Sequence, residues 1–589
     1  MKLLVLSKSR FDVSILSSLL AGLETENVNV TVVGDFIGDN SLLPSNIKLV
    51  RCTLEDYLLS DWEELIIEEL EPAWTSTLIS TGLGGILYMD GFDLGEMGKQ
   101  SFCTRVLKDK GRVLVGVKAI IDTEVPDLIA ADDFYIPYVR VLSKCPFITM
   151  QRFRPVSPLC PTGLLILLYA LVGVIYKVLW GTFFAKVLQT LKGVQPSEGC
   201  YTIFFGAQHG LKNLEPFFHW VVTTQNKEIY NFRPVGRVLL NRNILSPNIS
   251  YKVTYFEAFL DFRSLIRTLV LSIKLGLSVL KIWIQGTYKS SFRFRGKDVT
   301  ELFILEWARF TLVYGPGAIK YFFLAKHLLR LRPKKAFFDN ANSWEFNVLI
   351  QRLRDAGVVT ITYNHGVVAE IMPYRCQVDK VLVSGEHDFR LLSRINGNIA
   401  EFIVYGWLAP ASLESSGKEQ RSLLLLTTNL PELTRDFLYA TLLFIEEAWA
   451  QGKVEFEQIV IKLHPYESAS HAKQVISRFP ELLSYIKIEK RELHKWIHNA
   501  RMAFTTASTT ILDCLQFGVP TFVYLPYRLW TGGALYDLVP EPMRYRYSSE
   551  LHEKIGDISA VKDAGKRLLT LYFGPNPPDP ISVLARHLL

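Results

Sequence analysis

The stretch of the sequence best suited to chemistry is "IVIKLHPYES", residues 459–468, in which an apolar run ends in a lysine, a histidine and a proline. Pro465 has no N–H to donate to a sheet, so it ends the predicted strand and fixes the loop that follows. The imidazole of His464 can then point away from the sheet, where it can donate to a phosphate oxygen or protonate a leaving phosphate. A histidine at a strand end is more often structural, so this interpretation depends on a second polar feature.

That second feature is "TTASTTILDCLQFGVP", residues 505–520, which follows the apolar run "RMAF". The Ser-Thr-Thr run at 508–510 is predicted to begin a helix. Hydroxyl groups, backbone N–H groups and the positive end of a helix dipole together bind anions. A single hydroxyl at a helix start indicates only an ordinary cap. The combination with His464, and with Asp513 ahead of a Gly-Val-Pro turn, favours a phosphate site.

The order of these motifs resembles the GT-B glycosyltransferase superfamily, and within it the bacterial surface-carbohydrate branches that carry an HP motif followed by a Ser/Thr-rich motif. Those branches include sialyltransferases and polysialyltransferases, Kdo transferases and CDP-glycerol glycerophosphotransferases. The resemblance implies that His464 and the Ser508–Thr509 pair contact the nucleotide phosphates and that Asp513 reaches the ribose. Thr509 stands where a second serine is often found, which weakens the branch assignment more than the fold. The donor-binding residues implied are Lys462, His464, Pro465, Ser508, Thr509, Thr510 and Asp513.

An upstream region, "FDNANSWEFN" followed by "TITYNHGVV", is similar to the same proteins at residues 342–345 and 364–366. The glycerophosphotransferases likewise carry a His-Gly pair after the corresponding strand. The resemblance therefore implies that His365 faces the donor from the other lobe, where a base for the acceptor hydroxyl is needed, with Glu345 and Asp339 as rival bases. The alternative is a loop histidine beside a tight glycine turn.

The resemblance covers about residues 200–540 and says little of the N-terminal region. "YMDGFD", residues 88–93, has the look of the acidic base motif of sialyltransferases but lies outside this range. "YGPGAIKY", residues 314–321, is more typical of a turn than of a phosphate loop. No cluster has metal-ligand spacing, so we expect no metal and no cofactor besides the nucleotide-sugar substrate. The histidine and a helix dipole would then stabilise the leaving nucleotide.

Strand-like and helical runs alternate along the chain, which predicts parallel sheets. Two such units, joined by the polar segment 406–421, predict an α/β fold of the GT-B type, with two Rossmann-like lobes facing a cleft, an additional N-terminal α/β domain and apolar helices. The predicted domains are 1–155 (N-terminal α/β), 156–198 (apolar helix), 199–410 (acceptor lobe, with a basic and apolar insertion near 264–297), 411–545 (nucleotide-sugar lobe) and 546–589 (a helical tail packing back).

Two apolar segments leave the membrane question open. Residues 163–185 carry a lysine near the middle, which fits a buried core helix, an interfacial helix or a span. In the segment 264–285, Arg267, Lys274 and Lys281 are seven residues apart and share nearly one helical face. That spacing favours an interfacial helix, and a basic solvent-facing surface on an ordinary helix is the alternative.

Bulk composition sets the remaining limits. The 589 residues are 49% hydrophobic, enough for several cores, and the net charge of +7 suits a phosphate-rich ligand or an anionic membrane better than sequence-specific DNA readout. The seven cysteines form no CxxC pair, which predicts a reducing compartment without structural disulfides or zinc. The N-terminal apolar run is too short for a secretory signal, so we expect a cytoplasmic protein.

These features together predict a metal-independent transferase that moves a sugar from a nucleotide donor to a bacterial surface polysaccharide or lipopolysaccharide acceptor. It would act on a glycan or lipid-linked glycan at the inner face of the cytoplasmic membrane and would not bind nucleic acid. A CMP-activated acidic sugar is the preferred donor because of the HP and hydroxyl pairing. The alternatives are a polyol-phosphate transferase using a CDP-polyol and a non-catalytic scaffold or glycan-binding subunit.

Overall fold

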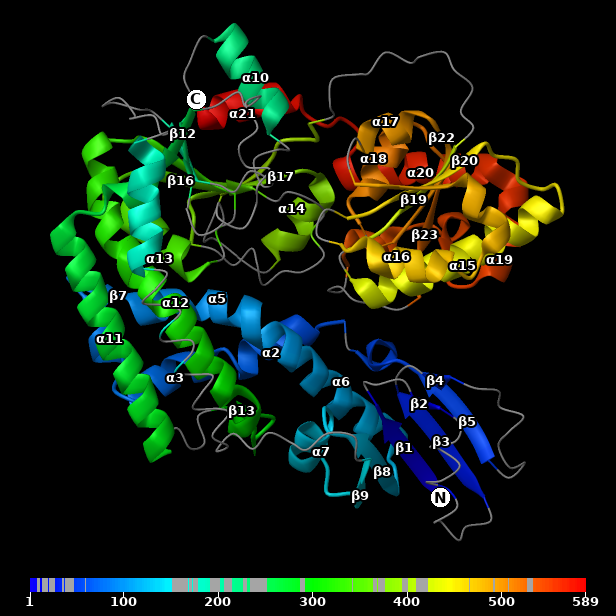
Figure 1. Cartoon of the computed structure of the whole chain (residues 1–589), viewed down its shortest axis with the longest axis horizontal. Coiled ribbons are helices and arrows are strands. Elements are labelled where there is room, and N and C mark those ends of the chain that lie inside the picture. The colour runs from blue at the N-terminus through cyan, green and yellow to red at the C-terminus, as the bar shows by residue number, and fades with distance from the viewer. Residues whose placement is uncertain are drawn as a thin grey trace.

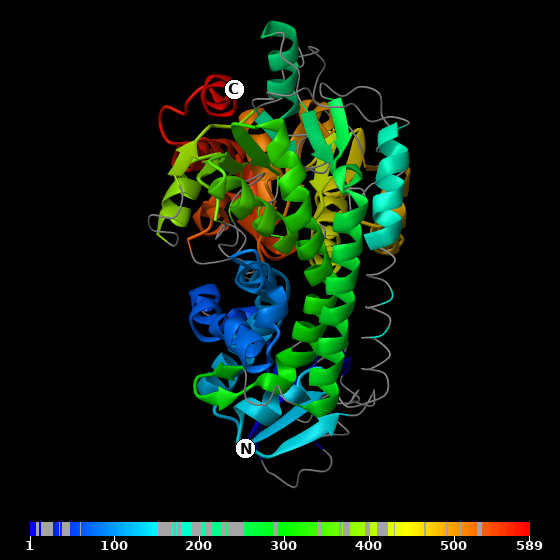
Figure 2. The same ribbon diagram turned by 90° about the vertical axis from the view of Figure 1, so that its left-hand side faces the viewer.

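Three parallel sheets organise the chain in a computed structural model (Figure 1). Two sheets lie side by side in the upper lobes of the view, and the third lies below them. Helices α2, α3 and α5 separate the third sheet from the first of the two lobes (Figures 1 and 2). The structure describes residues 1–7, 11–12, 20, 27–33, 36–37, 47–58, 60–150, 168, 172, 178–190, 202–205, 214–225, 230–233, 252–286, 292–339, 341, 343–363, 368, 377–394, 401–408, 422–428, 430–464, 467–490, 493–506, 508–526 and 533–589.

The N-terminal sheet is built from short apolar strands in the order β5-β3-β1-β8-β9, all parallel. The chain winds outward from β1 to β5 and then returns to the other side of β1. At that reversal Ser7 donates a hydrogen bond of 3.2 Å to Asp132. The strands are β1 (Lys2–Leu6), β3 (Val28–Val33), β5 (Ile47–Cys52), β8 (Leu128–Asp132) and β9 (Phe147–Met150).

A helical layer joins this sheet to the first lobe through one hydrophobic core, in which Trp74 of α3 packs on Trp307, Phe310 and Trp344 of later helices. The stretch 60–80 forms two helices, because Pro72 begins a new one. The helices of this layer are α2 (Trp62–Glu69), α3 (Pro72–Ser80), α4 (Gly84–Leu87), α5 (Leu94–Phe102), α6 (Lys108–Glu124), α7 (Ile136–Leu142), α11 (Phe262–Gln285) and α12 (Thr300–Leu328).

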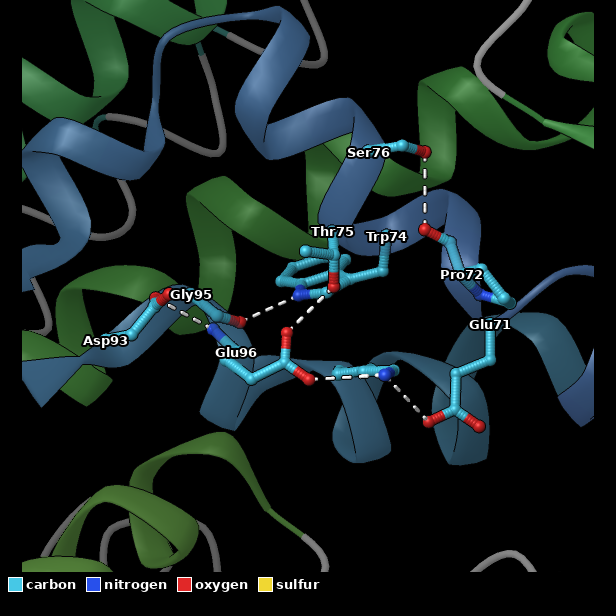
Figure 3. Close-up of polar contacts among 9 residues, drawn as sticks. Glu71, Pro72, Trp74, Thr75, Ser76, Asp93, Gly95 and Glu96 are labelled. Carbon is cyan, nitrogen blue, oxygen red and sulfur yellow. Dashed lines mark hydrogen bonds and ion pairs between the residues drawn. The ribbon is translucent and has the colours of Figure 1, made fainter.

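Polar contacts fix α3 against α5 (Figure 3). The indole of Trp74 donates to the carbonyl of Gly95 at 2.7 Å, and the hydroxyl of Thr75 donates to the carboxylate of Glu96 at 2.8 Å. Lys99 in turn donates to Glu96 at 3.2 Å. A buried indole N–H is thereby satisfied, so the aromatic core can close without an orphaned donor.

The stretch 88–93 forms a small hairpin between β6 (Tyr88–Met89) and β7 (Phe92–Asp93). Asp90 and Gly91 occupy its turn with φ of 48° and 82°. The carboxylate of Asp93 accepts a hydrogen bond of 3.0 Å from the backbone N–H of Glu96 and so caps α5. The acidic residues of this stretch therefore have turn and capping roles in the structure.

The first lobe contains a seven-stranded parallel sheet in the order β12-β11-β10-β15-β16-β17-β18. The winding again reverses once, between β10 and β15. The strands are β10 (Thr202–Phe205), β11 (Tyr230–Arg233), β12 (Lys252–Tyr255), β15 (Lys335–Phe338), β16 (Val359–Tyr363), β17 (Lys380–Val383) and β18 (Glu401–Val404), and the helices around them include α10 (Glu215–Thr224), α13 (Trp344–Asp355) and α14 (Glu386–Ser393).

The Gly-Pro-Gly stretch at 315–317 is not the turn that the sequence indicates, since α12 continues through it. A Cβ on Gly315 would lie 2.6 Å from the side chain of Leu275 in α11, and one on Gly317 would lie 2.8 Å from Glu345 in α13. The glycines thus allow close packing of α12 on both neighbours. Packing of this helix in the core overrides the local turn preference.

The second lobe contains a six-stranded parallel sheet in the order β21-β20-β19-β22-β23-β24. Its strands are β19 (Ser422–Leu426), β20 (Gln458–Lys462), β21 (Ile486–Glu489), β22 (Ala500–Thr505), β23 (Thr521–Tyr524) and β24 (Arg544–Tyr545). Its helices include α15 (Pro431–Ala450), α16 (Ala469–Ile476), α17 (Leu493–His498), α18 (Thr510–Gln516), α19 (Ser548–Lys554) and α20 (Ile558–Phe573).

The C-terminal helix α21 (Pro580–Leu588) leaves the second lobe and packs on the first, where Leu584 and Leu588 share a core with Phe204. On α20, the hydroxyl of Tyr572 donates to the carboxylate of Asp388 in the first lobe at 2.5 Å. The two doubly wound lobes with an added N-terminal α/β unit confirm the predicted fold class.

The membrane question concerns two segments. Most of residues 163–185 lie outside the described residues. Within the part of the chain that is described, no helix combines the length and the apolar character needed to cross a membrane.

Candidate functional site

The candidate site lies at the carboxyl edge of the second-lobe sheet. Strands β20 and β22 flank β19, and the register aligns Leu426 with both Lys462 and Thr505. The three strands therefore end level with one another. The winding of the chain reverses between β19 and β22, and open parallel sheets bind ligands at such a reversal. The residues that follow these strand ends are the ones placed to meet a ligand.

His464 follows β20 and is held by a short network of hydrogen bonds. Its backbone N–H donates to the hydroxyl of Thr427 at 3.1 Å. That hydroxyl donates to the carboxylate of Glu467, whose own N–H donates to the His464 carbonyl at 2.9 Å. The loop after β20 is thus tied to the end of β19 through three residues.

The imidazole of His464 is half-buried, and its pKa lies below the ordinary value because burial disfavours the charged ring and Lys462 repels it. At neutral pH the ring is therefore neutral and offers one N–H donor and one acceptor nitrogen. A bound phosphate would favour the protonated ring and shift the pKa upward.

Glu467 is a residue that the sequence analysis missed. It is 5% exposed, and within the described part of the chain its Oε1 has no hydrogen-bond partner. Burial raises the pKa of its carboxyl group, and hydrogen bonds from Thr427, the His464 backbone and Thr434 partly offset that rise. A donor from a bound ligand would stabilise Oε1 further. The available signal was an acidic residue three positions after the histidine, in "HPYE".

Hydroxyl groups gather at the end of β22. The Thr510 hydroxyl donates to Ser508 Oγ at 3.1 Å and lies 3.3 Å from that of Thr505. Thr509 is the N-cap of α18, with no side-chain capping bond. Thr506 is fully buried, and its Oγ1 finds no partner among the described residues. This second buried polar atom without a partner lies at the same sheet edge as Glu467.

Two predicted donor-binding residues have other described contacts. The ammonium of Lys462 donates to the carbonyls of Leu463 at 3.2 Å and Lys490 at 3.0 Å, and the residue is 8% exposed. Asp513 accepts a hydrogen bond of 3.2 Å from the indole of Trp407, which follows the last strand of the first lobe. Burial raises the pKa of Asp513 to about 6.

The first lobe contributes acidic residues at its own winding reversal. Asp339 directly follows β15, its N–H donates to the Phe205 carbonyl at 2.9 Å, and it is 3% exposed. Glu345 lies in the first turn of α13 and packs against Gly317. His365 and Pro465, the other two predicted site residues, lie outside the described residues.

No grouping of three or more His, Cys, Asp or Glu side chains that could hold a metal ion occurs among the described residues. The site as described combines an imidazole, several hydroxyls and a buried carboxylate at one sheet edge. Such a set can bind an anion beside a group rich in hydroxyls.

Comparison with known proteins yields structural likeness without sequence relatives. No protein-family model matches the chain, and no curated protein sequence matches it. Solved structures similar to it include the UDP-GlcNAc 2-epimerase of Methanocaldococcus jannaschii (12% identity, 66% of this chain and 98% of that chain, TM-score 0.39). MurG of Acinetobacter baumannii is similar with 8% identity over 67% of this chain and 99% of that chain, at a TM-score of 0.38. The S. aureus MnaA–UDP complex is similar with 9% identity over 66% of this chain and 95% of that chain, at a TM-score of 0.39.

These TM-scores lie below 0.5, which is too low to assign a class by structural similarity. The fold class is therefore taken from the chain's own sheets. Two doubly wound lobes in tandem, the second returning a terminal helix to the first, define an α/β protein of the GT-B type. The site at the second-lobe edge is the feature from which its function has to be argued.

Proposed function

We propose that the chain is a glycosyltransferase that moves a sugar from a nucleotide donor to a bacterial surface glycan, with the nucleotide bound at the second-lobe edge. One observation carries this proposal. Where β19, β20 and β22 end level, His464 lies at the same sheet edge as two buried atoms, Glu467 Oε1 and Thr506 Oγ1, that have no hydrogen-bond partner among the described residues. A ligand bound at a winding reversal can satisfy buried polar atoms that lie there.

In this proposal the neutral imidazole of His464 donates to a donor phosphate, and the hydroxyls of residues 505–510 supply further donors. As the bond to the sugar breaks, negative charge develops on the nucleotide phosphate and favours a protonated imidazole. Glu467 would accept from hydroxyl groups of the donor, since a carboxylate beside phosphate is repelled. Asp513 would hydrogen-bond to the ribose only after releasing its hydrogen bond from the Trp407 indole.

The first lobe would bind the acceptor and supply the base. His365, Glu345 and Asp339 are the candidates, and the base must come within hydrogen-bond reach of the acceptor hydroxyl. Closing the two lobes on the donor would exclude water and so suppress hydrolysis. The acceptor in the proposal is a polysaccharide, lipopolysaccharide or lipid-linked glycan.

The donor proposed is a CMP-activated acidic sugar, on the strength of the HP and hydroxyl motifs. A thermal-shift panel of CMP, CDP, UDP, GDP, their sugar conjugates and CDP-polyols tests it. Selective binding at 100-fold excess over Kd stabilises the folded chain by about 2.7 kcal/mol. Stabilisation by CDP-polyols instead would favour polyol-phosphate transfer, and the absence of any shift would favour a non-catalytic subunit.

The reaction is proposed to need no metal and to take place in the cytoplasm. Turnover measured with and without EDTA tests the first point, and loss of activity on chelation would contradict it.

A further inference from the structure

Helix α11 exposes an apolar stripe that runs from its first residue to its last turn. The helix is amphipathic, with a buried face that packs on α12. Its exposed apolar residues recur at helical spacing, and the most exposed are Phe262 (74%) and Ile284 (72%), one at each end. The stripe consists of Phe262, Ile266, Val270, Ile273, Leu277 and Ile284. Single exposed apolar residues are normal on a protein surface, whereas an apolar stripe of this length indicates an interaction site.

Only basic residues accompany the stripe. Arg263, Arg267, Lys274 and Lys281 are exposed, and the helix contains no Asp or Glu between Phe262 and Gln285. At 100° per residue the apolar positions occupy an arc of about 80°, and the basic positions occupy the adjoining arc of about 40°. Long basic side chains beside an apolar face can extend to anionic headgroups while their stems stay on apolar surface.

A second helix on the same flank of the molecule has the same character (Figure 2). Residues 178–190 are helical and bury Val178 and Ala185, while Trp180 (42%) and Phe183 (57%) are exposed. The only charged residue between 178 and 190 is Lys186. Two helices on one flank thus expose apolar and basic groups without an acidic one.

We propose that α11 lies flat on an anionic lipid bilayer, with the stripe in the headgroup region and its four basic residues at the anionic surface. Four charges in its 24 residues are incompatible with a span, and no helix in the described part of the chain, α11 included, is long and apolar enough to cross a membrane. A second copy of the chain is the rival occupant. Two such faces would bring eight basic residues together without acidic partners, so the charge favours the lipid surface.

Vesicle co-sedimentation of the full chain tests the proposal with a matched pair of variants. Leu277 on α11 is 59% exposed, and Leu571 on α20 of the second lobe is 56% exposed. Leu277→Glu is expected to lower the partition coefficient for phosphatidylcholine–phosphatidylglycerol vesicles about tenfold, whereas Leu571→Glu leaves it unchanged. Equal losses in the two variants, or no sedimentation of the unmodified chain, would overturn the proposal.

A charge variant separates lipid from self-association. Lys274→Gln combined with Lys281→Gln should lower binding to phosphatidylglycerol-containing vesicles about tenfold and leave the weaker binding to phosphatidylcholine alone unchanged. Light scattering of the chain without vesicles should show a monomer. A dimer that Leu277→Glu dissociates would assign the stripe to a second copy and overturn the proposal. None of these readouts depends on the proposed transferase activity.

Discussion

The two lobes are wound on the same plan but present different chemistry at the edges where the winding reverses. The second-lobe edge carries an imidazole, a group of hydroxyls and a buried carboxylate. The described first-lobe edge carries Asp339, enclosed against the end of β10. The plan therefore fixes where ligands can bind, whereas a few residues at the strand ends fix what binds there. We expect donor binding and base chemistry to be separable by mutation.

The largest effect is expected at the second-lobe edge. His464→Ala should lower turnover at least ~100-fold, because it removes the group proposed to neutralise the leaving phosphate. Steady-state kinetics with the donor found by the thermal-shift panel measure this, and His219→Ala, an exposed histidine on α10, is the control. Activity of His464→Ala equal to that of the control would exclude the proposed role.

A variant of the proposed base in the first lobe should lose turnover but keep its affinity for the donor. His365→Ala is expected to lower turnover ~100-fold while the nucleotide-induced thermal shift persists. Glu345→Gln and Asp339→Asn, measured alongside, identify the base if His365→Ala remains active. Loss of the thermal shift in the first-lobe variants would show that the two functions are not divided between the lobes.

A smaller effect is expected from the network that positions His464. Thr427→Val removes one hydroxyl that bonds both the His464 backbone and Glu467, so donor affinity should fall about tenfold. Thr427→Ser keeps the hydroxyl and should restore affinity. A Val variant that binds as tightly as the Ser variant would contradict a positioning role.

The smallest effect concerns Asp513 and pH. Its folded-state pKa of about 6 exceeds the ordinary 3.8, so its protonated form stabilises the fold below about pH 4 and this contribution is lost as pH rises through about 6. The midpoint of thermal unfolding, relative to that of Asp513→Asn, should therefore fall between pH 4 and 6. Parallel pH profiles for the two proteins would contradict a raised pKa of the buried Asp513 carboxyl group.

Local patterns predict the framework of the fold well. Short apolar runs such as β19 and β20, buried beyond their first residue, read directly as parallel strands, and β20 ends at Lys462 just before the predicted His-Pro loop. Helix breaks are predicted less well. The Gly-Pro-Gly of α12 stays helical in a core where Leu275 of α11 and Glu345 of α13 pack directly against its two glycines. Contacts between residues so far apart in the chain are not visible in the sequence.

The site residues stay a prediction. Strand-end position singles out His464 and the hydroxyls as candidates. It could not show that the Lys462 ammonium bonds to backbone carbonyls or that Asp513 meets Trp407, which is 106 residues away. Thr427 and Glu467 were missed because a threonine and a glutamate are ordinary in loops. The hydrogen bond between them forms only when β19 and the loop after β20 lie side by side.

Calorimetric titration of the nucleotide selected by the thermal-shift panel tests the central claim, that the second-lobe edge holds the donor, most directly. The unmodified chain and His219→Ala should bind one nucleotide with equal affinity, and His464→Ala should bind it at least ~10-fold more weakly, the loss of one charge-assisted hydrogen bond. Equal affinity in all three proteins would place the donor elsewhere and contradict the account.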